Sequence, residues 1–523
     1  MKENSNTYTR RRFLKAGTSL ATTAFMAPRA AWSAGNTLSE TAAGKEDDVF
    51  RQFRCPQWFR DVKFGLWLHW GPQSIPTKGA GHYARHMYVH PDDARESFGR
   101  DAWEYHRLTF GHQSDFGYKD ICNLWKADKF DAEQTIRLFK KWGARYVATM
   151  ANHHDNFDLF NSSVHKWNAL RVGPHRDILG EFAEAARRHD LKWVATSHAF
   201  WANWWFAPAF GADKHGPRQG EPYDGNLTQA DGLCTWWNGL DPQQLYAHKY
   251  EPFEREFGQR LVELVENYRP DMLYFDNGDI PPPALDACRR LYEDSRRRNG
   301  SIQTIVTVKK AQTGTLLDFE KGIADGIADE YWQTDTSLNE DWFLKTEGLD
   351  HALHHDARSL KELLVDIVSK RGALLLNIAV RHDGSIPDDQ YAVMEAFGEW
   401  LQANGEAIYE TVPWKTFGEG GLSAGGHFNE RRVTSEPWDD SVHRFTASKD
   451  GHTLYIHIFG NPAGKEIAIR SLADRKLFRA KVKGATLVGS GTTVGWRMTS
   501  DGLLLKMPET LSFKDCNIVK VKC

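Results

Sequence analysis

An aspartate at the end of a short apolar run is the first candidate for chemistry in this sequence. Asp276 follows the run Leu273–Phe275 and precedes an Asn-Gly turn. A run of this kind, bounded by a turn signal, is typical of a buried parallel strand. The last side chain of such a strand lies at the carboxyl edge of the sheet, where barrel enzymes keep their reacting groups. Asp276 is therefore a candidate catalytic carboxylate, with capping of the turn as the alternative role.

Histidines end three other apolar runs. His69 ends the first, the pair His153-His154 follows the second, and His198 ends the third together with Ser197. A single histidine in such a place is usually a satisfied residue of the core. Several at equivalent strand ends favour a shared site. Neutral imidazoles around a carboxylate fit a pocket that forms hydrogen bonds with the hydroxyls of one monosaccharide.

A metal site is the alternative for the same histidines. His69-Trp70 lacks the His-x-His spacing of metal-dependent barrel hydrolases. Adjacent strand residues point to opposite faces, so His153 and His154 are not expected to bind one ion unless the strand bends there. The six cysteines show neither a Cys-x-x-Cys pair nor a Cys/His metal spacing, so free thiols or one or two disulfides are expected. The sequence therefore predicts no metal and no other cofactor.

Strands and helices alternate over most of the chain, as a parallel sheet requires. The expected strands are Phe64–Trp70, Arg145–Met150, Trp193–His198, Met272–Asp276, Ile302–Val308, Asp329–Thr334 and Ala373–Ala379. Apolar residues recur at helical spacing in Asp177–His189, Pro252–Tyr268 and Leu360–Lys370. The pattern predicts an α/β fold with a (β/α)8-like barrel in which one unit is irregular or missing.

Two segments depart from this alternation. The stretch Trp201–Tyr250 is rich in Gly, Pro and Trp and lacks periodicity, which favours a long loop over the barrel mouth. After about Glu410, short alternating runs are separated by Gly, Asp and Asn. That texture predicts a C-terminal antiparallel β-sandwich that packs on the barrel or binds glycan.

Composition narrows the function class. The net charge of 523 residues is −3 and the charges are mixed, so no basic surface points to nucleic acid. The chain has 20 Trp, a residue whose flat apolar face stacks on sugar rings. A glycan is therefore the expected partner. The sequence leaves the oligomeric state open.

The N-terminus resembles a twin-arginine export signal of bacterial type. Thr9–Lys15 carries three arginines followed by Phe-Leu-Lys, and a modest apolar region Ala16–Ala27 precedes small residues. That region is too short and too polar to span a membrane. We expect a signal peptide at 1–34, a catalytic barrel at 35–408 and a β-sandwich at 409–523. The mature protein is expected in the periplasm or outside the cell.

The chain also resembles glycoside hydrolase family 29, the α-L-fucosidases. The resemblance is carried by motifs that occur in order over residues 50 to 405. They are Trp58–Asp61, Lys63–Gly71, His153–Asp155, Trp167–Ala169, Gly173–Asp177, Tyr268–Asp271, Trp332–Ser337, Val368–Gly372 and Leu374–Asn377.

The resemblance implies a retaining exo-α-L-fucosidase with Asp276 as its nucleophile. A retaining enzyme needs a second carboxyl group at about 5–5.5 Å that acts first as acid and then as base. In the family this is usually a Glu some forty residues after the nucleophile. Glu320 stands in that position, and Glu330 is the second choice. Both are Glu residues that a surface loop could also carry.

The sugar-binding residues expected from the resemblance and the strand ends are His69, Trp70, His153, His154, His198 and Tyr274. Three positions depart from the family pattern. Gly81-His82 stands where many relatives have Glu-Trp, Ser197-His198 where a Tyr is common, and Gln333 where some carry a Glu. These departures leave a related L-sugar possible as the substrate. The departures at Gly81, His82 and Gln333 also motivate an alternative, a catalytically silent sugar-binding protein. A metal-assisted hydrolase is a third alternative.

Overall fold

The computed structural model describes residues 48–93, 100–276, 278–345, 353–421, 428–429 and 436–523. The described residues belong to one compact unit that begins at Asp47. The expected signal peptide lies outside them. All six cysteines fall in the described part and are free, the first of the two expected states. Within the same residues, no helix has the length and apolarity needed to cross a bilayer.

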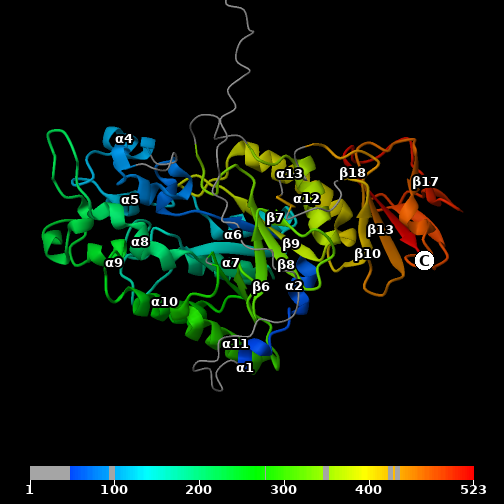
Figure 1. Cartoon of the computed structure of the whole chain (residues 1–523). Helices are drawn as coiled ribbons and strands as arrows, with labels where there is room; N and C mark the ends of the chain where they lie inside the picture. The colour runs from blue at the N-terminus through cyan, green and yellow to red at the C-terminus, as the bar shows by residue number, and fades with distance from the viewer. Residues whose placement is uncertain (1–47, 94–99, 277, 346–352, 422–427, 430–435) are drawn as a thin grey trace, which may run out of the picture. The chain divides into compact units, whose positions relative to one another are not determined.

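Eight parallel strands close into a barrel, as the alternation predicted (Figure 1). β9 pairs back with β1, with Phe64 opposite Leu374. In barrel order the strands are β1 (Phe64–Leu68), β2 (Tyr146–Asn152), β3 (Lys192–Ser197), β4 (Met272–Phe275), β5 (Ile305–Val308), β6 (Leu316–Glu320), β8 (Trp332–Ser337) and β9 (Gly372–Ile378).

The unit that sequence alternation missed is β6. It pairs in parallel with β5 and β8, but no helix lies between β5 and β6 or between β6 and β8, a stretch the structure describes throughout. Because the prediction relied on strand–helix alternation, a strand without a crossover helix gave no signal. This strand ends at Glu320, the expected acid.

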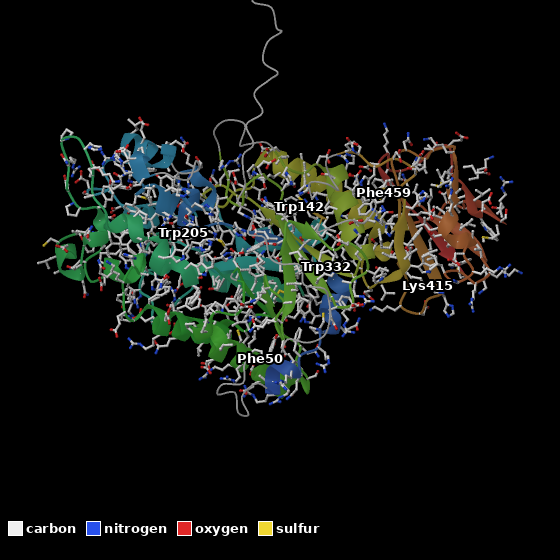
Figure 2. The ribbon with its side chains drawn as sticks, in the orientation of Figure 1. Phe50, Trp142, Trp205, Trp332, Lys415 and Phe459 are labelled. Atoms are coloured by element: carbon white, nitrogen blue, oxygen red, sulfur yellow. The ribbon has the colours of Figure 1, made fainter. Side chains whose placement is uncertain are left out.

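Side chains alternate between the barrel interior and the surrounding helices. The interior cluster contains Trp67, Tyr146, Tyr274 and Leu375, and Phe59 belongs to it as well. The outer cluster fills the layer under the helices. Figure 2 labels two of its buried indoles, Trp142 and Trp332. A residue two positions after an interior residue points to the same side of its strand. Polar residues at the strand ends can therefore also point into the barrel.

Helices cover the strands and are capped by local side chains. The Asp177 carboxylate accepts a hydrogen bond from Gly180 N at 3.0 Å and starts α7, and Asp356 caps α12 with Ser359 in a capping box. Gly300, in the left-handed conformation, ends α11. The larger barrel helices are α6 (Ala132–Lys141), α7 (Ile178–Arg188), α10 (Phe253–Tyr268), α11 (Leu285–Asn299), α12 (Ala357–Ser369) and α13 (Asp388–Asn404).

Shorter helices lie before the barrel strands and in the segment expected to be a long loop. They are α1 (Asp48–Arg51), α2 (Gln57–Val62), α3 (Tyr83–His86), α4 (Arg100–Thr109), α5 (Tyr118–Leu124), α8 (Ala202–Trp205) and α9 (Pro242–Tyr246). The segment 201–250 is otherwise irregular, with a few 3-10 turns. It exposes Trp201, Trp204 and Trp236, whereas most Trp are core residues.

The C-terminal region forms two antiparallel sheets that share one apolar core. The five-stranded sheet has the order β10 (Val412–Glu419), β12 (His443–Ala447), β13 (Thr453–Phe459), β18 (Cys516–Lys522) and β15 (Gly484–Leu487). The three-stranded sheet has the order β14 (Glu466–Ile469), β17 (Gly502–Lys506) and β16 (Gly495–Thr499). Ile456 and Val519 from the first sheet meet Ile469 and Leu505 from the second. The predicted β-sandwich is confirmed.

The five-stranded sheet packs on α12 of the barrel through a buried ion cluster. Arg444 Nε lies 2.6 Å from Asp366 Oδ1, and Lys370 Nζ lies 2.7 Å from Asp366 Oδ2. The Glu362 carboxylate also accepts a bond from Trp438 N at 3.0 Å. A short pair, β11 (Phe428–Asn429) with β7 (Gly322–Ile323), joins the C-terminal region to the segment just after β6.

Candidate active site

The carboxyl ends of the strands place a polar layer above the apolar barrel interior. Tyr274 belongs to the interior cluster, so Asp276, two residues later, points to the same side. Ile305 and Leu316 also belong to the interior cluster. By the same alternation, Lys309 points inward from β5, and Asp318 and Glu320 point inward from β6. Polar groups converge because every strand runs in the same direction, so all carboxyl ends lie at one edge.

Asp276 is surrounded by cationic or polar nitrogen groups. Its Oδ2 lies 3.3 Å from His198 Nδ1 and 3.9 Å from His154 Nε2, and its Oδ1 lies 3.8 Å from Lys309 Nζ. Burial alone would raise the pKa of Asp276, but the hydrogen bond and charge of His198, together with Lys309, lower it below its usual value. The carboxylate is therefore ionised at neutral pH, as a nucleophile requires.

Lys309 is the central charge of the site. Its Nζ lies 2.7 Å from Asp335 Oδ1, 2.9 Å from Asp318 Oδ1 and 4.0 Å from Glu320 Oε2. Burial would lower its pKa, but Asp318, Asp335 and Glu320 raise it well above the usual value. Sequence reasoning missed Lys309, although it directly follows an expected strand, in the position that identified Asp276.

Glu320 ends β6, and both it and Asp276 approach the same Lys309 ammonium group. Its side chain is 49% exposed, so a ligand can reach it. Partial burial, together with the charges of Asp335 and Asp276, raises its pKa to about 7 against the opposing effect of Lys309. Since each carboxyl group is within 4.0 Å of Lys309 Nζ, the two are separated by no more than the sum of those contacts.

Glu330, the second choice for the acid, lies elsewhere. It is exposed and precedes β8, which begins at Trp332, so it lies at the amino edge of the barrel. Gln333 is fully buried and bonds the Asp318 carboxylate at 2.6 Å. Its amide belongs to the barrel interior. The departure at Gln333 therefore does not remove an acid from the mouth of the site.

A buried hydrogen-bond network supports the reacting groups from below. Tyr274 donates to Asp335 Oδ2 at 3.1 Å, and Tyr146 donates to Gln333 Oε1 at 3.0 Å. Burial and the neighbouring Asp335 raise the pKa of Asp318 well above its usual value. Tyr274 is fully buried, so the structure places it beneath the pocket, where it holds Asp335, and not against a sugar as expected.

Four of the predicted histidines converge on one side of Asp276. The His153 and His198 ring centroids are 4.9 Å apart, and those of His69 and His198 are 5.5 Å apart. His154 also packs on His198, at 5.8 Å. His153 and His154 thus share a site, contrary to strict alternation, because β2 ends at Asn152 after its pairing with β3 shifts register.

Trp70 is the predicted sugar-binding residue that the structure places outside this cluster. Its ring packs on Trp125 at 4.9 Å and on Phe130 at 4.8 Å, and its indole N–H donates to the carbonyl of His382. Only 2% of its surface is exposed. It follows His69 and points the other way, into the packing outside the barrel.

Aromatic side chains that sequence reasoning did not select enclose the histidines. Trp205, from the segment 201–250, lies on His154 at 4.7 Å and beside His82 at 5.1 Å. Trp342 and Phe343 pack on His69 at 4.9 and 5.9 Å. No strand-end rule selects these residues, because Trp205 ends the short helix α8 and the other two lie on a loop.

The departure at Gly81 has a structural reason. Gly81 has φ +90°, and a Cβ at this position would lie 2.6 Å from the Phe343 ring and 3.5 Å from His153. A side chain here would be strained and would collide with the phenyl ring. The phenyl ring of Phe343 therefore occupies the space that a side chain at position 81 would need.

Two groups satisfy the distances of a metal site. The nitrogens of His69, His153 and His198 lie within 4.8 Å of one another, as do ligand atoms of His154, His198 and Asp276. Distance alone does not decide whether their lone pairs converge, because each neutral imidazole has only one. The absence of a metal stays a prediction.

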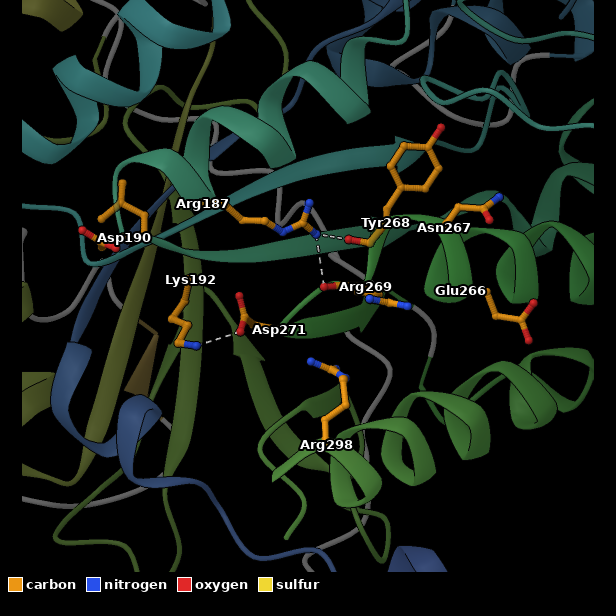
Figure 3. Close-up of a pocket in the computed structure, with 10 residues that line it drawn as sticks. Arg187, Asp190, Lys192, Glu266, Asn267, Tyr268, Arg269, Asp271 and Arg298 are labelled. Carbon is orange, nitrogen blue, oxygen red and sulfur yellow. Dashed lines mark hydrogen bonds and ion pairs between the residues drawn. The ribbon is translucent and has the colours of Figure 1, made fainter. Parts of the chain in front are cut away.

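A separate cleft lies at the other end of the barrel (Figure 3). It has a volume of about 1000 Å³ and lies beside the start of β3 and β4, where Lys192 Nζ contacts Asp271 Oδ1 at 2.8 Å. Arg187 donates to the backbone carbonyls of Tyr268 and Arg269. Its charged groups are largely exposed and form ordinary surface pairs.

Comparisons with known proteins agree with this geometry. The α-L-fucosidase family model matches residues 31–406. Tissue α-L-fucosidase of Rattus norvegicus is 28% identical over 70% of this chain and 72% of its own length. Plasma α-L-fucosidase of Homo sapiens is 26% identical over 87% of this chain and 86% of its own.

Solved structures share the fold. The α-fucosidase of Thermotoga maritima, in complex with a mechanism-based inhibitor, gives a TM-score of 0.67 at 24% identity, covering 91% of this chain and 98% of that one. A trapped covalent intermediate of an α-L-fucosidase from Bacteroides thetaiotaomicron gives 0.60 at 16% identity, covering 89% and 95%. With a barrel that carries two carboxyl groups at its carboxyl edge and a family model that matches most of its length, this chain belongs to the α-L-fucosidase family of glycoside hydrolases.

Proposed function

We propose that the protein is a retaining, exo-acting α-L-fucosidase with Asp276 as nucleophile and Glu320 as acid and base. The observation that carries the proposal is the pair of carboxyl groups that share Lys309, one with a lowered and one with a raised pKa. When the pKa values of two carboxyl groups are shifted in opposite directions, the group with the lower pKa can act as nucleophile and the other as acid.

In the first step, an ionised Asp276 oxygen attacks the anomeric carbon of the terminal sugar. The bond from that carbon to the glycosidic oxygen breaks, and the proton of Glu320 moves to that oxygen. A glycosyl ester on Asp276 and an ionised Glu320 result. The aglycone leaves as the alcohol.

In the second step, water attacks the same carbon. Glu320 accepts the water proton, the ester bond breaks, and Asp276 returns to its ionised form. The negative charge of Asp276 contributes to the raised pKa of Glu320 in the free enzyme. Esterification removes that charge, so the pKa of Glu320 falls when it must act as a base.

The choice of L-fucose rests on the names of the relatives. Because Gly81 and His82 depart from the family pattern, a related L-sugar is a second candidate substrate. The first experiment therefore compares aryl α-L-fucoside with aryl α-L-galactoside. Turnover of the fucoside with the α-anomer as the first product, seen by proton NMR, is expected. An initial β-anomer would contradict retention, and turnover of neither substrate would contradict the proposed activity.

The acid assignment is tested with Glu320→Ala on two substrates. Activity should fall far more on a fucosyl disaccharide than on an aryl fucoside with a good leaving group, because only the poor leaving group needs a proton. Azide should restore aryl fucoside turnover and give the α-configured azide. Glu330→Ala serves as the matched control with wild-type rates. Equal losses on both substrates without azide rescue would reject Glu320.

We also propose export by the twin-arginine route to the periplasm or beyond. Thr9–Lys15 and the apolar region after it support this proposal. Replacing Arg10, Arg11 and Arg12 by lysines should retain the protein in the cytoplasm. Export of that variant would contradict the proposed twin-arginine route.

A further inference from the structure

We propose that Gln73 and Asn377 are positioning residues that hold His153 and His69 in opposite tautomers. The pocket then offers one N–H donor and one lone pair to two hydroxyls of the same sugar. The inference rests on the proposed function and extends it to the hydrogen-bonding pattern that the substrate must match.

The tautomer of His69 follows from the partners of Asn377. The amide nitrogen of Asn377 donates to the carbonyl of Trp342 at 2.8 Å and to Ser337 Oγ at 3.0 Å. Because a carbonyl only accepts, the side-chain oxygen of Asn377 must face His69. It lies 3.0 Å from His69 Nδ1 and also accepts the backbone N–H of His69 at 2.8 Å. Nδ1 of His69 therefore carries the proton.

The opposite result follows for His153. The backbone N–H of Ala84 donates to Gln73 Oε1 at 3.3 Å, which leaves the amide nitrogen of Gln73 facing His153 Nδ1 at 2.8 Å. An amide nitrogen only donates, so Nδ1 of His153 accepts. Gln73 is 1% exposed, so water does not compete for its amide. Nε2 of His153 therefore carries the proton.

Both rings are neutral, so each carries a single N–H. The state of Nδ1 therefore determines whether Nε2 is protonated. Burial lowers the pKa of His69 and of His153 well below the usual value, and His198 lowers both further. Within the described part of the chain, hydrogen bonds are found only at Nδ1 of each ring. His69 Nε2 is left with a lone pair and His153 Nε2 with an N–H.

His154 adds a second acceptor by the same logic. Its Nδ1 lies 2.9 Å from the His198 carbonyl and must donate to it. Burial lowers its pKa to about 3, so Nε2 is an unprotonated nitrogen 3.9 Å from Asp276 Oδ2. The three imidazoles thus provide two acceptors and one donor.

This pattern selects among ligand classes. A metal ion needs converging lone pairs, and the N–H of His153 removes one from the group of three histidines. An anionic sulfate or carboxylate would face the lone pairs of His69 and His154 and be repelled. A hydroxyl both donates and accepts, so the pattern fits a neutral sugar with free hydroxyls at these positions.

The tautomers can be measured in the whole protein by two-bond proton–nitrogen NMR of histidine labelled with nitrogen-15. His69→Asn and His153→Asn assign the signals. In wild type we expect a protonated Nε2 on His153 and a protonated Nδ1 on His69. The reverse result for either ring would overturn the proposal, and this measurement needs no mutant of Gln73 or Asn377 to fold.

The same change of amide to acid should act oppositely at the two positions. In Gln73→Glu the carboxylate only accepts, so His153 should become protonated at Nδ1. In Asn377→Asp the oxygen facing His69 is retained, so His69 should keep its Nδ1 proton. Binding of L-fucose to Gln73→Glu should weaken about tenfold, the equivalent of one hydrogen bond. The loss should appear mainly in KM for the aryl fucoside.

Gln390→Glu is the matched control, because Gln390 is equally buried but bonds only the backbone of Ala379. It should bind L-fucose as wild type does. A reversed His153 tautomer with unchanged affinity would overturn the inference. Failure of wild type to bind or cleave a fucoside would reject the proposed function instead, while the NMR result would still report the tautomers.

Discussion

Both ends of the barrel carry a lysine paired with aspartate, but the two sites differ in their exposure to solvent. At the amino end, Lys192 and Asp271 form a pair with 41% and 29% of their side chains exposed, in the wall of a surface cleft (Figure 3). At the carboxyl end, Lys309 is 14% exposed and meets two carboxylates that are almost completely buried. Exposed charges are screened by water, whereas buried charges shift each other's pKa.

The comparison shows that a cleft lined by charged residues is not by itself a reactive site in this barrel. The cleft at the amino end carries paired surface charges. The carboxyl end gathers four carboxyl groups around one lysine. Asp276, Asp318, Glu320 and Asp335 all lie within 4.0 Å of one lysine. One lysine cannot neutralise four carboxyl groups, so some must hold protons at neutral pH. Because the negative charges are not fully neutralised, the pKa values of these carboxyl groups are shifted, as is typical of a reactive site.

Asp276→Gly should have the largest effect. Loss of the nucleophile removes the covalent route, and kcat/KM for aryl α-L-fucoside should fall by about 10⁴-fold or more. Azide can occupy the vacated space and attack in a single displacement, so the product should be the β-configured azide. The α-configured azide, or activity within tenfold of wild type, would show that another group is the nucleophile.

Lys309→Met should have the next largest effect. The positive charge lowers the pKa of both Asp276 and Glu320, so its loss should weaken the nucleophile, with kcat/KM at pH 6 reduced on the order of 10²-fold. The alkaline limb of the pH profile reflects deprotonation of Glu320 and lies near pH 7 in wild type. In this variant the pKa of Glu320 rises, so the limb should move to higher pH.

Lys309→Arg keeps the charge and is the control for folding, because a bare cluster of buried carboxylates destabilises the protein strongly. It should retain the wild-type alkaline limb. A limb that stays at the same pH in Lys309→Met would contradict the role of Lys309 in setting the pKa of Glu320.

Asp271→Asn should have the smallest effect. The ion pair with Lys192 is exposed to solvent, and such pairs contribute about 0.2–1 kcal/mol to the free energy of unfolding. The amide oxygen can still accept from Trp193 N, which now bonds the carboxylate at 3.0 Å. Denaturant unfolding should show a loss of this size and kcat/KM should stay within twofold. A tenfold loss of activity would mean that the two ends are coupled.

Much of the fold was predictable because its signals are local. Seven barrel strands were expected from apolar runs and turn residues, and the sheets of the C-terminal region were expected from short alternating runs. The strand β6 was missed, since its sequence Leu-Leu-Asp-Phe-Glu places two acidic residues inward and no helix precedes it. No pattern placed those acids on a strand, whereas pairing with β5 and β8 holds them in the barrel wall.

The site was predictable to the extent that strand ends define it. Asp276, Glu320 and four histidines were selected by position or by resemblance. The same rule selected Trp70, which points outward. It passed over Lys309, although alternation from Ile305 would have placed Lys309 inward. Gln73, Trp205 and Phe343 lie in a 3-10 turn, in the short helix α8 and on a loop. The path of these segments depends on distant contacts, so no local pattern could select the three residues.

The sequence by itself determined the family, the parallel strands and the nucleophile candidate, because motifs and apolar periodicity are written in neighbouring residues. The tertiary structure decided which carboxyl group lies near Asp276, which cation contacts both of them and which nitrogen of each histidine bears a proton. Those properties depend on distances between residues far apart in the chain. Burial then converts such distances into shifted pKa values and fixed tautomers.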